Sequence, residues 1–335
     1  MITVGKQNLI TDVPGIKVGN SQDEKIRTGV TVIIPDEPAI ASADIRGGGP
    51  GTRETDALNS DCLVDVVHGI VLSGGSAFGL DAAGGVMANL KMQKIGFNLG
   101  DAIIPIVPSA ILFDLLNGGD KEWGIKSPYF DLGFKAVENM GPGVFDLGNA
   151  GAGYGAIAGG VKGGLGSASF VFSDNGTEIT LGAIAAVNSM GSLTMPGSQT
   201  MWAFPYEQNN ELGNQPMPKK NARIDLDFSF DLPIGKNTTL VTVATDAVLT
   251  KPQARRVAIM AQDGLARAIR PIHSPFDGDS VFVLSTGRTE LSDPVVGVSR
   301  LGMLAADCVA RAIARGVYQA ETMGDVDSYR DRCKS

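Results

Sequence analysis

The sequence is poor in the residues that most catalytic and metal sites use. His68 and His273 are the only histidines in 335 residues, and Cys62, Cys308 and Cys333 stand far apart without a Cys-x-x-Cys pair. A Ser-His-Asp triad is therefore poorly supplied, and neither a disulfide framework nor a zinc site is indicated. We expect His68 to have a packing role. We also expect the protein to use no metal or cofactor, and its three thiols to stay reduced in a cytoplasm.

Positive charge and long apolar runs are also scarce. The net charge is −8 and the basic residues form no cluster, which argues against nucleic acid and anionic membranes as partners. The segment Met1–Gly15 lacks the apolar run of a signal peptide. The most apolar stretch, Ile103–Leu116, contains two prolines and an aspartate and is too short to span a bilayer. We expect it to form a buried strand that runs into a helix, in a cytoplasmic protein.

Glycine, by contrast, is abundant. The 44 glycines have no fixed period and are interleaved with aliphatic residues, so the chain is expected to be globular. Two glycine-rich segments, Arg46–Arg53 and Ser73–Leu80, could in principle form anion-binding nests. Neither matches a Walker A or GxGxxG pattern, and tight packing explains the glycines equally well. We favour packing for both.

Apolar and β-branched runs between turn residues predict strands interspersed with helices. Pro252 and Pro271 bound a helix over Lys251–Arg270, and an apolar stripe from Leu301 to Val317 predicts a C-terminal helix. Gln208–Lys220 is a predicted surface loop. The irregular spacing indicates one α+β domain over residues 1–335. The predicted strands are Val30–Ile34, Gly69–Leu72, Ser167–Phe172, Ile179–Val187, Leu240–Ala244 and Val281–Ser285.

The segment most informative about function is Pro275–Gly287. Its Asp-Gly-Asp turn stops directly before a β-branched and aromatic run, which makes Ser280 the first residue of a strand. If the Ser280 hydroxyl cleaved the Asp279–Ser280 bond, Ser280 would gain a free α-amine. Such an amine has a reference pKa of roughly 7.7–8 and could act as the general base without any histidine. Alone, however, this motif is usually just a turn.

Nine segments in order along the chain together resemble the DmpA-type aminopeptidases and the nylon-oligomer hydrolase. These proteins are autoprocessing N-terminal-nucleophile hydrolases, in a superfamily that includes ornithine acetyltransferase. Any one segment would be weak evidence, but the whole set is specific. The segments are Ile10–Gly19, Thr28–Val32, Arg46–Gly48, Leu72–Leu80, Gly151–Gly155, Ala186–Ser189, Asn237–Thr239, Ala244–Asp246 and Asp277–Phe282.

The resemblance implies roles for individual residues. Ser280 matches the nucleophile, and the chain would be cut between Asp279 and Ser280. Tyr154 and Asn188 match residues that polarise the substrate carbonyl or hold the oxyanion. The structural alternatives are that Tyr154 caps an edge of the core and that Asn188 forms a turn. Asn237 is a second candidate oxyanion donor or a turn former.

Two further matches concern charged residues. Lys162 matches a lysine of the nylon hydrolase that could orient the nucleophile or lower its pKa, although a lysine among glycines most often faces solvent. Relatives carry an acidic residue on the C-terminal helix to orient the nucleophile's amine, and Arg311 occupies that position here. Asp307 lies one turn earlier on a neighbouring part of the same face and is a candidate substitute.

The resemblance also implies a fold and an activity. We expect a four-layer α-β-β-α sandwich, self-cleaved into residues 1–279 and 280–335, which stay associated in a homo-oligomer of four or more subunits. The expected activity is hydrolysis of small peptides or amides: aminopeptidase, β-peptidyl or D-aminoacyl amidase, or 6-aminohexanoate-oligomer hydrolase. The alternatives are an acyltransferase of the ornithine acetyltransferase kind and a non-catalytic scaffold in which Ser280 merely starts a strand.

Overall fold

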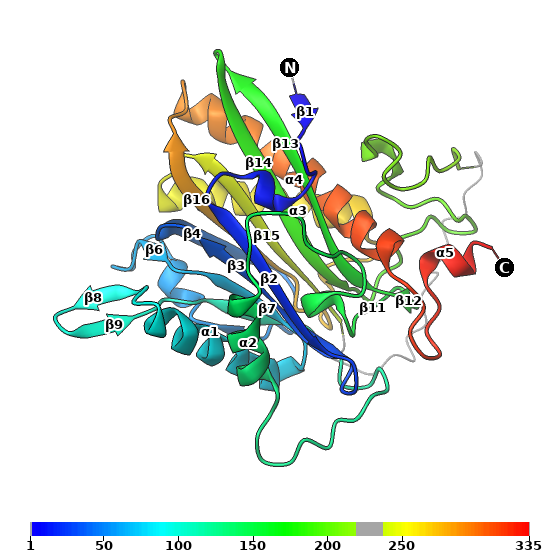
Figure 1. Cartoon of the computed structure of the whole chain (residues 1–335). Coiled ribbons are helices and arrows are strands. Elements are labelled where there is room, and N and C mark those ends of the chain that lie inside the picture. Colours follow the sequence, from blue (N-terminus) through cyan, green and yellow to red (C-terminus); the bar gives the residue numbers. More distant parts are fainter. Residues whose placement is uncertain (1, 219–236, 335) are drawn as a thin grey trace.

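The structure, a computed structural model, describes residues 2–218 and 237–334, and these form four layers in the order helices, sheet, sheet, helices (Figure 1). The larger sheet has seven strands in the order β1-β13-β14-β15-β16-β4-β6. Within it β15 and β16 are parallel, whereas the other neighbouring pairs are antiparallel. Its strands are β1 (Ile2–Val4), β4 (Ala39–Ile45), β6 (Val66–Val67), β13 (Gly164–Asp174), β14 (Thr177–Asn188), β15 (Thr238–Ala247) and β16 (Ser280–Thr289).

The smaller sheet has five strands in the order β2-β3-β7-β10-β5, and two hairpins complete the β structure. The hairpin β8–β9 projects from the body of the molecule (Figure 1). The five strands are β2 (Ile16–Asp23), β3 (Thr28–Pro35), β5 (Thr52–Arg53), β7 (Ile70–Ser73) and β10 (Ser109–Ile111), and the hairpins are β8 (Phe97–Leu99) with β9 (Ala102–Ile104) and β11 (Ile157–Ala158) with β12 (Val161–Lys162).

Helices cover the outer face of each sheet. Helices α1 (Asp81–Met92) and α2 (Tyr129–Glu138) pack on the smaller sheet, and α3 (Lys251–Ala268) and α4 (Pro294–Gln319) pack on the larger one. A short α5 (Tyr329–Arg332) follows α4. The 3-10 turns are η1 (Ile10–Asp12), η2 (Asp56–Leu58), η3 (Ser76–Leu80), η4 (Gly151–Gly153) and η5 (Phe204–Tyr206). The expected four-layer α+β architecture is therefore confirmed.

Three buried clusters fill the three spaces between the layers. One joins α3 and α4 to the larger sheet, one lies between the sheets, and one joins the smaller sheet to α1 and α2. Strand β16 shows the alternation that this requires: Val281 and Val283 face the helices, whereas Phe282 and Leu284 face the other sheet. By the same alternation, the side chain of Ser280 points into the space between the sheets.

The six strands predicted by residue range are present, as are the helix predicted from Lys251 and the C-terminal helix. Helix α3 begins with a capping box in which Thr250 and Gln253 exchange hydrogen bonds, and Pro252 stands in its first turn. The helix ends at Ala268, two residues earlier than expected, because Ile269 is already extended ahead of Pro271. The predicted loop Gln208–Lys220 is a loop over its described part, residues 208–218; residues 219 and 220 lie outside the described residues.

One expectation was wrong. The stretch Ile103–Leu116 does not run into a helix: β9 ends at Ile104, β10 is a buried strand, and a loop follows until α2. Pro105 and Pro108 separate the two strands, and the left-handed Gly118 and Gly119 turn the chain where a helix would have continued.

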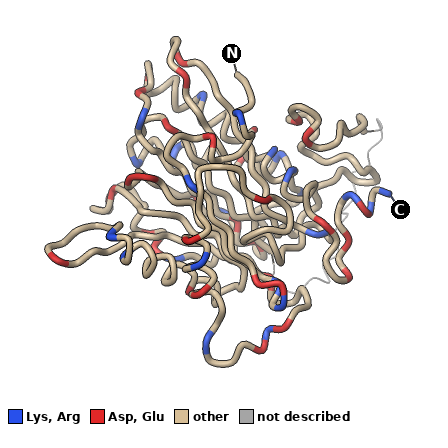
Figure 2. The backbone as a smooth tube through the Cα atoms, viewed as in Figure 1, with Lys and Arg blue, Asp and Glu red and all other residues tan. Residues whose placement is uncertain are grey.

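Charged residues are spread over the described part of the chain. Basic and acidic residues both occur along the whole of the described backbone trace, and the basic ones lie in short, separate segments (Figure 2). Among the described residues, no helix combines the length and apolarity needed to cross a membrane.

Candidate active site

Ser280 lies at the start of a central strand and is fully buried. Its neighbours across β15 and β4 are Leu240 and Ile45. The Ser280 hydroxyl donates a hydrogen bond of 2.9 Å to the carbonyl of Gly278, so it is turned back toward the peptide bond that precedes it. Because Ser280 and Asp279 each have 0% relative exposure, that peptide bond is out of reach of an external protease.

The turn before Ser280 is fixed through the Asp279 carboxylate. This carboxylate accepts hydrogen bonds from the backbone N–H of Thr239 at 2.8 Å and from that of His273 at 3.0 Å. The Nδ1 atom of His273 lies 2.9 Å from the same carboxylate. Burial, together with the charge of Asp279, raises the pKa of Asp277. Two buried carboxyl groups thus flank the Gly278 turn.

Asn188 lies on the same face of the larger sheet and at the same end. It ends β14 opposite Thr238, two strands from Ser280, and shares the orientation of Ile184 and Ala186 toward the other sheet. Its side-chain oxygen accepts the Ile157 N–H at 2.8 Å, and its nitrogen donates to the Phe113 carbonyl at 3.1 Å. The amide is therefore held in one orientation.

Lys162 is buried, in contrast to the usual solvent-facing lysine. Its ammonium group donates to the carbonyls of Gly153 at 3.1 Å and Gly163 at 2.7 Å, with 2% of the residue exposed. Burial lowers its pKa to about 7, against the opposing charge of Asp114. Tyr154 follows Gly153 directly and is half-buried, and burial raises the pKa of its phenol. Lys162 therefore lies against the turn that places Tyr154.

Asn237 contacts the turn through its backbone. Its carbonyl accepts the Gly278 N–H at 3.0 Å, and Asn237 forms a parallel bridge with Asp277. The described contacts of Asn237 thus support its role in shaping the turn before Ser280.

Asp307 is not brought together with Ser280. It lies on α4 and pairs with Arg267 of α3, on the helix-covered side of the larger sheet. The Ser280 side chain points to the opposite side of that sheet. The shared helix face that suggested Asp307 is therefore directed away from the nucleophile candidate.

Arg311 is the centre of a buried ion network. Its guanidinium pairs with Glu211 at 2.6 Å and donates to the Ser169 carbonyl and to the Asn8 side chain, while Arg315 also contacts Glu211. Arg311 has 0% relative exposure. These contacts join α4 to the segments that carry Asn8, Ser169 and Glu211, so the arginine has a structural function.

We expect Arg311→Ala to lower the free energy of unfolding by about 3–5 kcal/mol, because it leaves a buried carboxylate without its closest partner. Urea unfolding of the uncut Ser280→Ala chain with and without the substitution measures this. Lys126→Ala is the matched control: its ion pair with Asp131 is exposed and should contribute about 1 kcal/mol or less. Equal effects of the two variants would contradict the assignment.

Three groups near the site were missed by reasoning from the sequence. Asp114 is buried, accepts hydrogen bonds from Thr28 and the Gly75 N–H, and has a pKa raised by burial. His273 contacts Asp279, although its loop gave no sign of this, whereas His68 has the expected packing role: it is buried and accepts the Ile106 N–H. The third group is the backbone of Arg46 and Gly47 after β4, where the sequence favoured packing alone: both N–H groups donate to the Asp279 carbonyl.

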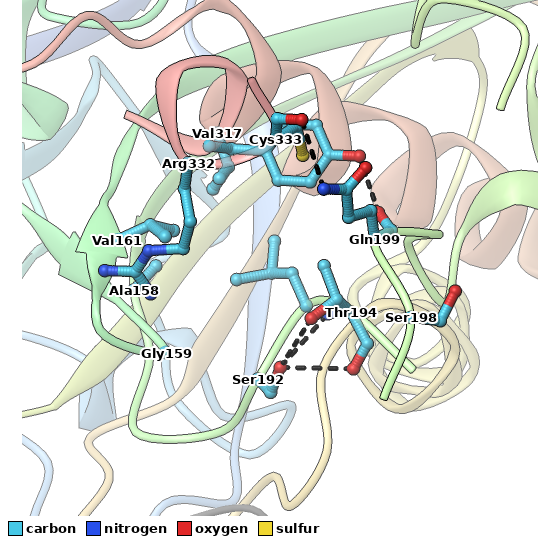
Figure 3. A pocket seen from close by; sticks show the side chains of 12 residues that line it. Ala158, Gly159, Val161, Ser192, Thr194, Ser198, Gln199, Val317, Arg332 and Cys333 are labelled. Atoms are coloured by element: carbon cyan, nitrogen blue, oxygen red, sulfur yellow. Dashed lines mark hydrogen bonds between the residues drawn. The ribbon is translucent and has the colours of Figure 1, made fainter. Parts of the chain in front are cut away.

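A separate cavity of about 90 Å³ lies beyond the β11–β12 hairpin (Figure 3). Among its lining residues, Tyr329 donates to the Gln199 carbonyl, and the Ser192 hydroxyl donates to the Thr194 carbonyl. Neither Ser280 nor Asn188 lines it, so this cavity is distinct from the site around the nucleophile candidate. The lining residues are Ala158, Gly159, Val161, Ser192, Leu193, Thr194, Ser198, Gln199, Val317, Tyr329, Arg332 and Cys333.

Comparison with known proteins decides the family. The model of peptidase family S58 matches residues 8–330 of this chain. The chain belongs to peptidase family S58. An uncharacterized aminopeptidase of Mycobacterium tuberculosis (strain ATCC 25618 / H37Rv) is 39% identical over 97% of both chains. The 6-aminohexanoate-oligomer endohydrolase of Kocuria sp. (strain KY2) is 28% identical over 96% of this chain and 86% of its own.

Solved structures agree on the fold of this S58 peptidase. A Burkholderia sp. beta-aminopeptidase superposes with a TM-score of 0.74 at 22% identity and covers 100% of this chain and 95% of its own. The L-aminopeptidase D-Ala-esterase/amidase from Ochrobactrum anthropi, described as a variant of the Ntn hydrolase fold, gives 0.72 at 21% identity over 97% and 89%. The S58 peptidase accordingly shares the fold of these two structures.

Proposed function

We propose that this S58 peptidase cuts itself between Asp279 and Ser280 and then uses Ser280 as an N-terminal nucleophile on small aminoacyl peptides and amides. The observation that carries the proposal is the placement of Ser280: it is buried, starts a central strand, and shares a sheet face with Asn188. Cleavage would give this serine the amine that it needs as a base. Cleavage would also have to open the buried site before substrate could enter.

In the proposed reaction the Ser280 hydroxyl attacks the substrate carbonyl, and its proton passes to the α-amine of the same residue. The leaving amine takes up that proton, and water then hydrolyses the acyl ester. Asn188 and Tyr154 are assigned to the oxyanion. Asn188 ends β14 and binds the Ile157 N–H, and Tyr154 follows η4 three residues before Ile157. Lys162 is assigned to the electrostatics of the nucleophile. Asp307 receives no role.

The relatives favour an aminopeptidase over an oligomer endohydrolase. The Mycobacterium tuberculosis protein named an aminopeptidase is 39% identical, whereas the Kocuria endohydrolase is 28% identical and is covered over less of its length. Family membership also favours hydrolysis over acyl transfer and over a non-catalytic scaffold. A homo-oligomer, a cytoplasmic location and the single domain of two processed fragments stay predictions.

Release of p-nitroaniline from aminoacyl anilides tests the substrate class. We expect the processed enzyme to hydrolyse L-, D- or β-aminoacyl anilides and to leave N-acetylated versions intact, because an aminopeptidase must recognise the substrate's free amine. Acetyl transfer from acetylornithine to glutamate, assayed in parallel, should be absent. An enzyme that cleaves only 6-aminohexanoate oligomers, or acetylated anilides equally well, would contradict an aminopeptidase.

A further inference from the structure

The carbonyl of the proposed scissile bond has two hydrogen-bond donors. The Asp279 carbonyl oxygen accepts the backbone N–H of Arg46 at 3.1 Å and that of Gly47 at 3.3 Å. The regular pairing of β16 with β4 stops at Ser280 and Ile45. Beyond that pair, the chain after β4 bends across the 277–279 turn, so two consecutive N–H groups converge on one oxygen.

We propose that the Arg46 and Gly47 N–H groups form the oxyanion hole for self-cleavage of the chain. The inference rests on the proposed function, because it assigns a part in the maturation of that site. Two backbone donors at a buried carbonyl are the arrangement that stabilises a developing oxyanion. The Asp279 carboxylate is held at the same time by Thr239 and His273, which keeps the carbonyl from turning away.

The rearrangement to an ester needs no reactant besides the chain, and the hydrolysis that follows takes up one water molecule. The Ser280 oxygen bonds to the Asp279 carbonyl carbon, and negative charge collects on the carbonyl oxygen between the two N–H groups. The bond from that carbon to the Ser280 nitrogen then breaks, and the nitrogen gains the proton that the hydroxyl lost. The product is an ester between Asp279 and Ser280, which water hydrolyses to an Asp279 carboxylate and a free Ser280 hydroxyl.

Glycine at position 47 is required by the close approach of the two segments. A Cβ atom on Gly47 would lie 2.3 Å from the Asp277 oxygen and 2.4 Å from the Asp279 nitrogen, both backbone atoms that could yield only by moving the scissile segment. At Gly49 the nearest atom to an added Cβ would be 3.7 Å away, an ordinary contact. The same glycine run therefore supplies both a test position and its control.

Gly47→Ala keeps the N–H, but its Cβ forces that group away from the Asp279 carbonyl. We therefore expect it to slow conversion of the full chain into residues 1–279 and 280–335 by about 100-fold, as when an oxyanion donor is lost. Gly49→Ala should process at close to the wild-type rate. Pulse-labelled protein followed by intact mass gives both rates. Replacing Gly47 by glycolic acid, which deletes the N–H without adding a side chain, should slow processing in the same direction even if the alanine variant fails to fold.

Hydroxylamine shows whether the two N–H groups act when the ester forms or when it is hydrolysed, because it cleaves an ester but not an amide. If the donors act in forming the ester, hydroxylamine will not restore cleavage between Asp279 and Ser280 in Gly47→Ala. The glycolic acid variant is left out of this assay, because hydroxylamine would cut its own backbone ester between residues 46 and 47. Rapid cleavage of Gly47→Ala on addition of hydroxylamine would overturn the inference. If both position-47 variants processed at the wild-type rate while the Ser280→Ala chain stayed uncut, the proposed oxyanion hole would be overturned but self-cleavage by Ser280 would not. A wild-type chain that never cuts would overturn self-cleavage as well.

Discussion

Ser280→Ala is expected to leave the chain whole and to abolish turnover of every aminoacyl substrate. Without the hydroxyl no ester can form with Asp279, so the bond between residues 279 and 280 stays an amide. Without cleavage there is no α-amine to act as the base, and the site around residue 280 remains buried. Intact mass and anilide hydrolysis on the same preparation measure the two losses together.

Ser280→Cys is the matched control for this variant. A thiol in place of the hydroxyl keeps a nucleophile of similar size, so the variant should still cut, at an altered rate, whereas the alanine chain should not. Retention of wild-type activity by an uncut Ser280→Ala chain would remove Ser280 from the mechanism. Cleavage of the alanine chain at the same bond would point to another nucleophile or to a separate protease.

Lys162→Met is expected to lower the activity of processed enzyme by about 100-fold or more. The wild-type amine, with a pKa lowered by burial to about 7, changes charge within the working pH range and lies against the turn that carries Tyr154. Methionine fills the same space without the charge or the donors. Anilide hydrolysis measured against pH should show a weaker dependence near pH 7 in the variant than in the wild type.

The same pKa predicts how stability depends on pH. A lysine in the unfolded chain keeps its proton up to about pH 10.4, whereas folded Lys162 loses it above about pH 7. Between these two pKa values the unfolded state binds more protons than the folded state, so the contribution of Lys162 to the free energy of unfolding rises with pH. In the uncut Ser280→Ala background, the gain in unfolding free energy from pH 7 to 9 should be smaller in Lys162→Met by an amount on the order of 2 kcal/mol.

Lys135→Met provides the control, since Lys135 is exposed on α2. It should change neither the activity nor the pH dependence of unfolding. A Lys162→Met enzyme with wild-type turnover would show that the buried amine is structural. Parallel pH dependences in Lys162→Met and its parent would show that the amine stays protonated in the fold.

The sequence was sufficient for much of the fold because the signals are local. Alternating apolar residues mark β16, and Pro252 and Pro271 bound α3 within two residues. The same alternation decided which face of β16 carries Ser280, but only once the layers on each side were known. The stretch after β10 failed because its apolar residues pack in a loop, where periodicity carries no information.

The site was only partly predictable. Ser280 stands out through the turn before its strand, whereas Lys162 offered no local sign of burial. The contact of His273 with Asp279, and the approach of Gly47 to the same residue, join loops whose relation depends on the tertiary fold. Asp307 shows the reverse failure: position on a helix face suggested a role that the intervening sheet prevents.

The most direct test of the account is the intact mass of purified wild-type protein under denaturing conditions, with the N-terminal residue of the smaller species determined. The account predicts two species, residues 1–279 and residues 280–335, the second beginning with serine. A single species of 335 residues that nonetheless hydrolyses aminoacyl anilides would contradict it, because the enzyme would then act without the amine that cleavage creates.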